Sequence, residues 1–177
     1  MRIVAGQWRG RQLKSPDWEG LRPTSDRLRE TLFNVLGPSV RGATVLDGYA
    51  GTGAIGIEAL SRGAASVTFV ERDPRAVKLI EANLAALGAT GVIMRAGLGD
   101  AVTRLGGQVF DLIMLDPPYA DTAAAEALDA ARALASPGTR VVVEHATRHP
   151  PPPGPSGLRL TRTVKAGDSA LSFYEHP

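Results

Sequence analysis

The chain has 177 residues, the size of one domain with a short extension. Hydrophobic residues make up 44% of the sequence and charged residues 21%, which excludes wholesale disorder, a collagen-like fibre and a coiled coil. Cysteine is absent, which excludes disulfides, thiolate metal sites and a cysteine nucleophile. No run of about 18 apolar residues occurs, so we expect neither a signal peptide nor a membrane span, and a cytoplasmic protein.

Basic residues are concentrated at the start of the chain. The net charge is +2, but residues 1–41 hold eight Lys/Arg and four acids, a local charge of +4, so the remainder carries −2. Trp8 and Trp18 lie among these charges. Basic side chains interleaved with aromatic ones favour the binding of nucleic acid, although the charge alone fits a solvated, Arg-rich surface equally well.

The front of the chain is predicted to form a small β-hairpin followed by a helix. Residues 2–4 and 11–14 can pair as antiparallel strands. After Pro23-Thr24-Ser25, one helical face is formed by Leu28, Leu32, Val35 and Leu36. We therefore divide the chain into an N-terminal basic hairpin, residues 1–20, and a main domain, residues 21–177.

Short β-rich runs alternate with helical stretches after residue 42, the pattern of βαβ units in a mostly parallel sheet. The predicted strands are 45–46, 66–71, 91–94, 110–115 and 139–144. The predicted helices are 54–61, 74–87, 101–105 and 122–135. Asp73, Pro74 and Gly88 mark the two ends of the second of these helices.

The end of the chain is predicted to add a hairpin to the sheet. Residues 149–157 contain four consecutive prolines and must be an exposed connection. Residues 158–164 and 170–174 then flank a turn and are typical of an antiparallel hairpin at the sheet edge. The predicted fold is therefore α/β, with a mostly parallel seven-stranded sheet, helices on both faces and an antiparallel C-terminal hairpin.

A glycine-rich turn follows the first of these strands. Gly51, Gly53 and Gly56 match G-x-G-x-x-G between a strand and a helix. Glu71 ends the next strand, where an acid accepts hydrogen bonds from ribose hydroxyls. Asp47 would repel a pyrophosphate but suits a cationic ligand. S-adenosylmethionine, which carries an ammonium and a sulfonium group, is such a ligand.

The run Asp116-Pro117-Pro118-Tyr119 ends the fourth strand, at the edge where open α/β sheets bind ligands. Consecutive prolines fix the backbone and leave carbonyl oxygens as acceptors. Asp116 and the Pro117 carbonyl can hold both hydrogens of an exocyclic amino group and direct its nitrogen toward an electrophilic methyl group. Tyr119 offers a flat surface on which a base can stack.

These motifs resemble those of class I S-adenosylmethionine-dependent methyltransferases that modify amino groups of bases. Three further segments, GQWRGR at 6–11, LRPTSDRLRETLFN at 21–34 and GIEALSRGA at 56–64, resemble the bacterial 16S ribosomal RNA guanine-N2 methyltransferase family. The resemblance covers nearly the whole chain. It implies a Rossmann-like class I methyltransferase fold and methylation of the N2 amino group of one guanine in small-subunit ribosomal RNA.

The resemblance also implies roles for individual residues. The catalytic group that orients and stacks the guanine would be Asp116, Pro117 and Tyr119. The residues around S-adenosylmethionine would be Thr24, Arg27, Asp47, Tyr49, Gly51, Gly53, Glu71, Arg72, Asp100 and Asp116. The residues that contact RNA in the basic extension and just after it would be Arg2, Trp8, Arg9, Arg11, Lys14 and Arg22.

Two positions depart from the family pattern. Gly48 stands where a bulkier residue is usual, which loosens the loop. Residues 96–100 contain no clearly registered Asp or Asn for the adenine amino group, so that Asp100 or a backbone carbonyl would serve. The implied reaction is a direct in-line displacement without a covalent intermediate. We expect no metal site, because the three histidines lack metal-ligand spacing and are assigned to the surface: His145, His149 and His176.

Three other functions share some of these sequence features. A methyltransferase acting on amino groups of DNA bases normally carries a separate target-recognition domain, for which 177 residues leave no room. A nicotinamide-dependent oxidoreductase leaves Asp47 and the proline pair unexplained. A non-catalytic RNA-binding assembly factor would be favoured by the loss of Asp116 or Glu71, and both are present. The expected partner is 16S ribosomal RNA in an assembling 30S subunit, bound by a monomer, with ribosomal proteins or folded RNA supplying part of the specificity.

Overall fold

The computed structural model describes residues 1–20, 24–120, 122–154 and 157–177. Its helices are α1 (Asp26–Leu36), the 3₁₀-helix η1 (Gly37–Val40), α2 (Ala54–Ser61), α3 (Pro74–Leu87), α4 (Leu98–Arg104) and α5 (Ala123–Arg132). Its strands are β1 (Thr44–Gly48), β2 (Ser66–Glu71), β3 (Val92–Arg95), β4 (Leu112–Leu115), β5 (Arg140–Ala146), β6 (Arg159–Ala166) and β7 (Ser169–Glu175). The predicted short helix at 101–105 begins earlier, at Leu98.

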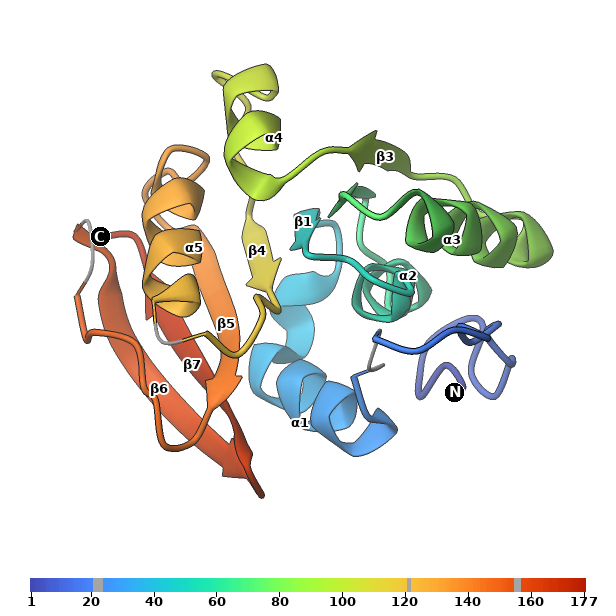
Figure 1. Cartoon of the computed structure of the whole chain (residues 1–177), viewed down its shortest axis with the longest axis horizontal. Helices are drawn as coiled ribbons and strands as arrows, with labels where there is room; N and C mark the ends of the chain where they lie inside the picture. Colours follow the sequence, from blue (N-terminus) through green and yellow to red (C-terminus); the bar gives the residue numbers. More distant parts are fainter. Residues whose placement is uncertain (21–23, 121, 155–156) are drawn as a thin grey trace.

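Seven strands form one sheet in the order β3-β2-β1-β4-β5-β7-β6 (Figure 1). Strands β1 to β5 pair in parallel. Strand β7 inserts between β5 and β6 and is antiparallel to both. The predicted α/β fold, with its mostly parallel sheet and its C-terminal hairpin at one edge, is confirmed.

The two faces of the sheet carry separate layers of helices. Figure 1 shows α1, α2 and α3 on one side of the strands and α4 and α5 on the other. Side chains alternate along each strand, so Val45 of β1 joins the core under α1 and α2, while Leu46 joins the core under α4 and α5. Both faces of the central strands are therefore apolar, as expected for a sheet covered on both sides.

Local signals explain the ends of the best-defined helices. The Asp73 carboxylate accepts a hydrogen bond from the Arg75 N–H at 2.8 Å, and Gly88 takes a left-handed conformation with φ of 64° at the other end of α3. Ser25 caps α1 in the same way, accepting from the Leu28 N–H at 3.1 Å. These contacts are encoded by neighbouring residues, and the predicted bounds of α3 are confirmed.

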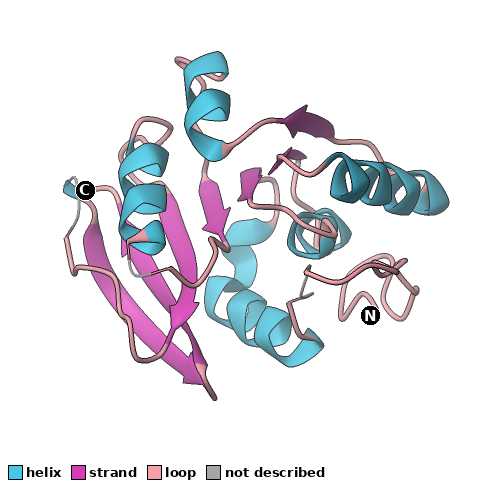
Figure 2. Cartoon of the chain, in the orientation of Figure 1, coloured by secondary structure: helices cyan, strands magenta, loops and turns pink. Residues whose placement is uncertain are grey.

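The antiparallel pairing predicted for the N-terminal segment is present but too short to form strands, and Figure 2 draws this segment as a loop. Residues 1–14 do fold back on themselves, but Arg2 and Gln12 form one isolated antiparallel bridge. The N–H groups of Val4 and Ala5 donate to the Glu58 carboxylate on α2, at 2.8 and 2.9 Å, instead of continuing the pairing. A contact with α2 therefore interrupts the ladder.

Among the residues that the structure describes, no helix combines the length and apolar character needed to cross a membrane.

Candidate active site

Acidic side chains mark the carboxyl ends of neighbouring parallel strands. Asp47 lies near the end of β1, Glu71 at the end of β2, Asp116 just after β4 and Glu144 near the end of β5. The register pairs Leu115 with Val143, so the next residues, Asp116 and Glu144, are level with each other and on the same face of the sheet. The edge that the sequence pointed to thus carries four carboxyl groups.

The glycine turn between β1 and α2 is held by Glu71. One Glu71 carboxylate oxygen accepts the N–H of Gly51 and the other accepts the N–H of Asp73, each at 2.8 Å. Gly51 and Gly53 have φ values of 54° and 76°, a region that favours glycine. A Cβ on Gly53 would lie 3.1 Å from Ile80 Cγ1 on α3, so the backbone here approaches its neighbour closely.

Asp47 is 2% exposed, and its carboxylate accepts the N–H of Gly56 on α2 at 2.8 Å. Burial raises the pKa of Asp47, and the nearby Asp116 and Glu71 carboxylates add to the rise, while the bond from Gly56 opposes it. The structure thus gives Asp47 a role in tying β1 to α2. Its predicted contact with a bound ligand stays a prediction.

Asp116 is half-buried beside α1. The Thr24 hydroxyl donates to Asp116 Oδ2 at 3.2 Å, which brings together two predicted site residues that are far apart in the chain. Burial raises the pKa of Asp116 to about 7, the Glu144 carboxylate adds to the rise, and the Thr24 hydrogen bond opposes it. A carboxyl group with this pKa can change its proton occupancy near neutral pH.

Tyr119 presents its ring to solvent and anchors its hydroxyl. The side chain is 52% exposed, the hydroxyl donates to Glu144 Oε1 at 2.7 Å and its oxygen lies 2.6 Å from Ser169 Oγ on β7. Burial of the hydroxyl raises the pKa of Tyr119 to about 12. The predicted stacking of a base on this exposed ring stays a prediction.

Glu144 was not predicted as a site residue. It is 7% exposed, follows the apolar run Val141 to Val143, and contacts Tyr119. A glutamate after three buried β-branched residues, at the carboxyl end of a parallel strand, is the signal that could have identified it. Its proximity to Asp116 depends on strand register, which the sequence does not show.

The remaining predicted cofactor residues surround the same edge. Tyr49, half-buried with a positive φ of 63°, follows β1 directly, and the charges of Arg72 and Glu126 act on its hydroxyl. Burial of the Tyr49 hydroxyl raises its pKa. Arg72 is exposed after β2, Asp100 is exposed in the first turn of α4, and Arg27 is exposed in the first turn of α1.

The surface role predicted for His145 is wrong. His145 is 4% exposed, and its Nε2 lies 2.9 Å from Ser172 Oγ on β7. Its Nδ1 lies 2.9 Å from the Ala146 carbonyl oxygen. The central position of β5, between β4 and β7, buries this side chain. His149 is exposed and His176 half-buried.

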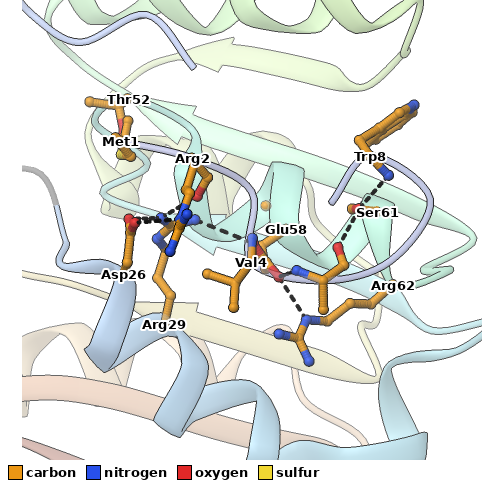
Figure 3. A network of polar contacts seen from close by, with 12 residues as sticks. Met1, Arg2, Val4, Trp8, Asp26, Arg29, Thr52, Glu58, Ser61 and Arg62 are labelled. Atoms are coloured by element: carbon orange, nitrogen blue, oxygen red, sulfur yellow. Dashed lines mark hydrogen bonds and ion pairs between the residues drawn. The ribbon is translucent and has the colours of Figure 1, made fainter. Parts of the chain in front are cut away.

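Part of the basic charge at the front of the chain is buried, and Figure 3 shows the polar network around it. Arg29 is fully buried and donates to Glu58 Oε2 at 3.3 Å, to the Arg2 carbonyl at 2.7 Å and to Asp26. Arg62 donates to the other oxygen of Glu58 at 2.8 Å. This network, formed by Asp26, Arg29, Glu58 and Arg62, holds the N-terminal segment, and Arg29 is not available to a polyanion.

The other basic residues of this segment remain at the surface. Arg2, Arg9, Arg11 and Lys14 are exposed, and the Arg11 guanidinium donates to the Ala86 carbonyl of α3 at 2.8 Å. Trp8 is half-buried, and its backbone N–H donates to Ser61 Oγ at 3.1 Å. Arg22, also predicted to contact RNA, lies outside the residues that the structure describes.

The strand order, the glycine turn after β1 and Asp-Pro-Pro-Tyr after β4 define a class I methyltransferase, which takes its methyl group from S-adenosylmethionine. A family model described as "Conserved hypothetical protein 95" matches residues 1–175. The chain belongs to this family. It is also similar to a curated relative, ribosomal RNA small subunit methyltransferase D of Escherichia coli. The two are 37% identical over 99% of this chain and 89% of the relative.

Solved structures agree with this assignment. The protein yhhF from Escherichia coli superposes with a TM-score of 0.88 and 36% identity, covering 99% of this chain and 97% of that one. SMU.776, solved in complex with S-adenosylhomocysteine, shares the fold at a TM-score of 0.70 and 14% identity, covering 85% of this chain and 49% of that one. These relatives therefore favour a methyltransferase over the alternative of a nicotinamide-dependent oxidoreductase.

Proposed function

We propose that the protein transfers a methyl group from S-adenosylmethionine to the exocyclic N2 amino group of one guanine in 16S ribosomal RNA. The observation that carries the proposal is the position of Asp116. Its carboxyl group stands at the end of β4, next to the glycine turn, and a rigid proline pair follows it. The Escherichia coli relative is named for methylation of small-subunit ribosomal RNA, which supports the choice of substrate.

The residues at the ends of β1 and β2 fit S-adenosylmethionine. Each Glu71 oxygen accepts one backbone N–H and keeps a lone pair for a ribose hydroxyl. Gly51 adds no side chain at the turn, which leaves room for a ligand against the backbone, while Gly53 lets the turn pack closely on Ile80. The cofactor supplies an electrophilic methyl group on a sulfonium. Further contacts are proposed from Thr24, Arg27, Asp47, Tyr49, Arg72, Asp100 and Asp116.

Asp116 and Pro117 would act on the amino group of the base. The lone pair of guanine N2 is delocalised into the ring, so the nitrogen must pyramidalise before it can attack. The Asp116 carboxylate and the Pro117 carbonyl each accept one N2 hydrogen and hold the nitrogen in line with the methyl carbon. The N–C bond forms as the C–S bond breaks, its electrons stay on sulfur as a neutral thioether, and the surplus N2 proton passes to Asp116.

The N-terminal segment is the proposed RNA-binding extension. Arg2, Arg9, Arg11 and Lys14 are exposed on it, and cations placed against phosphates release condensed counterions. Trp8 belongs to the same segment and Arg22 follows it. We propose an assembling 30S subunit as the substrate and a cytoplasmic monomer as the active form, with folded RNA or ribosomal proteins supplying part of the specificity.

The test is transfer of tritiated methyl from S-adenosylmethionine to 16S ribosomal RNA, free and in subunit particles, from cells that lack their own guanine-N2 methyltransferase. We expect the label to appear as N2-methylguanosine on nucleoside analysis, and more of it in assembly intermediates than in free RNA. Label in another nucleoside, or none in RNA while S-adenosylmethionine still binds, would contradict the proposed substrate. Equal labelling of free RNA and particles would contradict the proposed role of the particle.

The pH dependence of the reaction is expected to follow Asp116. Its pKa is raised to about 7, and only the ionised carboxylate accepts both an N2 hydrogen and the departing proton. We therefore expect kcat/KM to rise about tenfold per pH unit below pH 7 and to level off above it. The carboxylates of Glu144, on β5, and Asp47, on β1, lie near Asp116, and the Glu144 charge raises the pKa of Asp116.

Glu144→Gln removes one of these charges, so the midpoint of the kcat/KM profile should move to lower pH. The profile is measured with wild type and Glu144→Gln in buffers of constant ionic strength. A wild-type profile that stays flat between pH 5.5 and 8.5 would contradict a role for the Asp116 carboxylate.

The same proton affects stability in the opposite direction to activity. Because the folded state binds the Asp116 proton more tightly than the unfolded state, the free energy of unfolding falls as pH rises toward 7.

A further inference from the structure

Glu144 is a buried carboxylate with one oxygen left over. It is 7% exposed, and its Oε1 accepts the Tyr119 hydroxyl at 2.7 Å. Its Oε2 is also buried and has no hydrogen-bond partner among the residues that the structure describes. A buried acceptor without a partner is costly, so this oxygen calls for a donor beyond the described residues, which a bound base can supply.

The position of this oxygen belongs to the base-binding edge. Glu144 is level with Asp116, because β4 and β5 pair in parallel with Leu115 opposite Val143. Glu144 lines two small hollows, one with Thr24 and the other with Pro117 and Tyr119. The Tyr119 hydroxyl holds one oxygen of the carboxylate, and the other oxygen keeps its acceptor capacity.

Guanine differs from the other amino-bearing bases in the group next to its amino group. Beside N2 it carries a ring N1–H, which is a second donor. Adenine and cytosine carry a ring nitrogen acceptor beside their amino groups, N1 in adenine and N3 in cytosine. An ionised carboxylate only accepts hydrogen bonds, so it fits guanine and faces the lone pair of the other two bases.

We propose that Glu144 determines specificity for guanine, with its free oxygen accepting the N1–H while Asp116 and the Pro117 carbonyl hold the N2 amino group. The inference rests on the proposed function. Two level carboxylates then meet adjacent donors of one base edge. Adenine or cytosine with its amino group at Asp116 would place a ring nitrogen acceptor against Glu144. The lone pair of that nitrogen and the Glu144 carboxylate would then repel each other, and neither would have a donor.

The closeness of the two carboxyl groups supports this arrangement. The Glu144 carboxylate raises the pKa of Asp116, so ionisation of Asp116 is disfavoured in the free protein. A base edge with several N–H donors offsets this repulsion, and a base with an acceptor at the same place does not. Tyr119 contributes its ring to stacking and its hydroxyl to the orientation of Glu144.

The test uses 2-aminopurine, which keeps the 2-amino group but has a ring N1 without hydrogen. A synthetic RNA segment carries 2-aminopurine in place of the guanine that the wild-type enzyme labels. The segment is ligated into 16S ribosomal RNA, and the particle is then reconstituted. For wild type we expect kcat/KM on 2-aminopurine about 100-fold below that on guanine, the loss of one hydrogen bond to a charged group. Equal transfer to the two bases overturns the proposal without recourse to any variant.

Glu144→Gln is the matching variant. Its amide carbonyl can still accept from Tyr119, and its NH₂ then takes the place of the free oxygen and faces guanine N1–H donor to donor. We expect the guanine rate to fall and the 2-aminopurine rate to rise, so that the preference for guanine shrinks at least 30-fold. The ratio compares two substrates on one preparation, so a fraction of unfolded protein cancels. Glu175→Gln, at the far end of the β6–β7 hairpin, should leave both rates unchanged.

The outcomes separate this inference from the proposed function. Wild-type enzyme that forms no N2-methylguanosine contradicts the proposed function itself. Wild-type enzyme that forms it, with the same preference in Glu144→Gln, overturns the role of Glu144 alone. Glu144→Gln that loses activity on guanine and 2-aminopurine by the same factor also overturns it, because that pattern shows a structural residue.

Discussion

Replacement of Asp116 by asparagine is expected to lower methyl transfer by a factor of about 100 to 1,000 while S-adenosylmethionine still binds. Asparagine fills the same volume and keeps one carbonyl oxygen that can accept from Thr24 or from the amino group. It removes the negative charge that offsets the positive charge developing on N2, a loss of the size seen when one preorganised electrostatic contact is deleted. It also removes the acceptor for the departing proton.

The measurement is single-turnover methyl transfer, with binding of S-adenosylmethionine followed separately by calorimetry. Asp129→Asn is the matched control, because Asp129 is an exposed aspartate on α5 and its replacement removes the same charge from a residue outside the proposed site. Its rate should equal that of wild type. Full activity in Asp116→Asn would show that another group orients the amino nitrogen, and the mechanism given above would be wrong.

Replacement of Glu58 by glutamine is expected to destabilise the protein by about 3 kcal/mol, the lower part of the range for breaking one side of a buried ion pair. Glu58 is fully buried and accepts from Val4, Ala5, Arg29 and Arg62. Glutamine keeps the shape but has one acceptor oxygen in place of two, and it leaves the buried Arg29 with a single carboxylate partner, Asp26. The expected fall in Tm is about 10 °C for a chain of this size.

Urea unfolding, followed by circular dichroism, gives the free energy directly. Glu175→Gln is the control, because its ion pairs with Arg140 and Arg159 have N–O distances of 3.6 and 3.5 Å and lie at the surface. Surface pairs contribute about 0 to 1 kcal/mol, so the control should unfold almost like wild type. Equal stability of Glu58→Gln and wild type would mean that the N-terminal segment is not held by this network.

The elements with local signals could be predicted from the sequence. The bounds of α3 follow from Asp73, Pro74 and Gly88, whose effects act within one helical turn. The bounds of α2 and β2 were predicted equally well: Gly53 and Gly63 flank α2, and β2 is an apolar, β-branched run that ends before Asp73 and Pro74. Asp-Pro-Pro-Tyr and the glycine turn needed no tertiary information either, since each is a contiguous motif placed at a strand end.

The class of fold, the family and the contiguous parts of the site therefore follow from the sequence alone. The contacts between residues far apart in the chain depend on the tertiary structure. The register of β4 and β5 places Glu144 beside Asp116, and Arg29 is buried because it pairs with the Glu58 carboxylate. The N-terminal hairpin gives way to contacts with α2 for the same reason. Buried charged and polar groups pair with the partners that tertiary packing brings near them. These pairings therefore depend on how the elements pack together and not on the sequence of any one element.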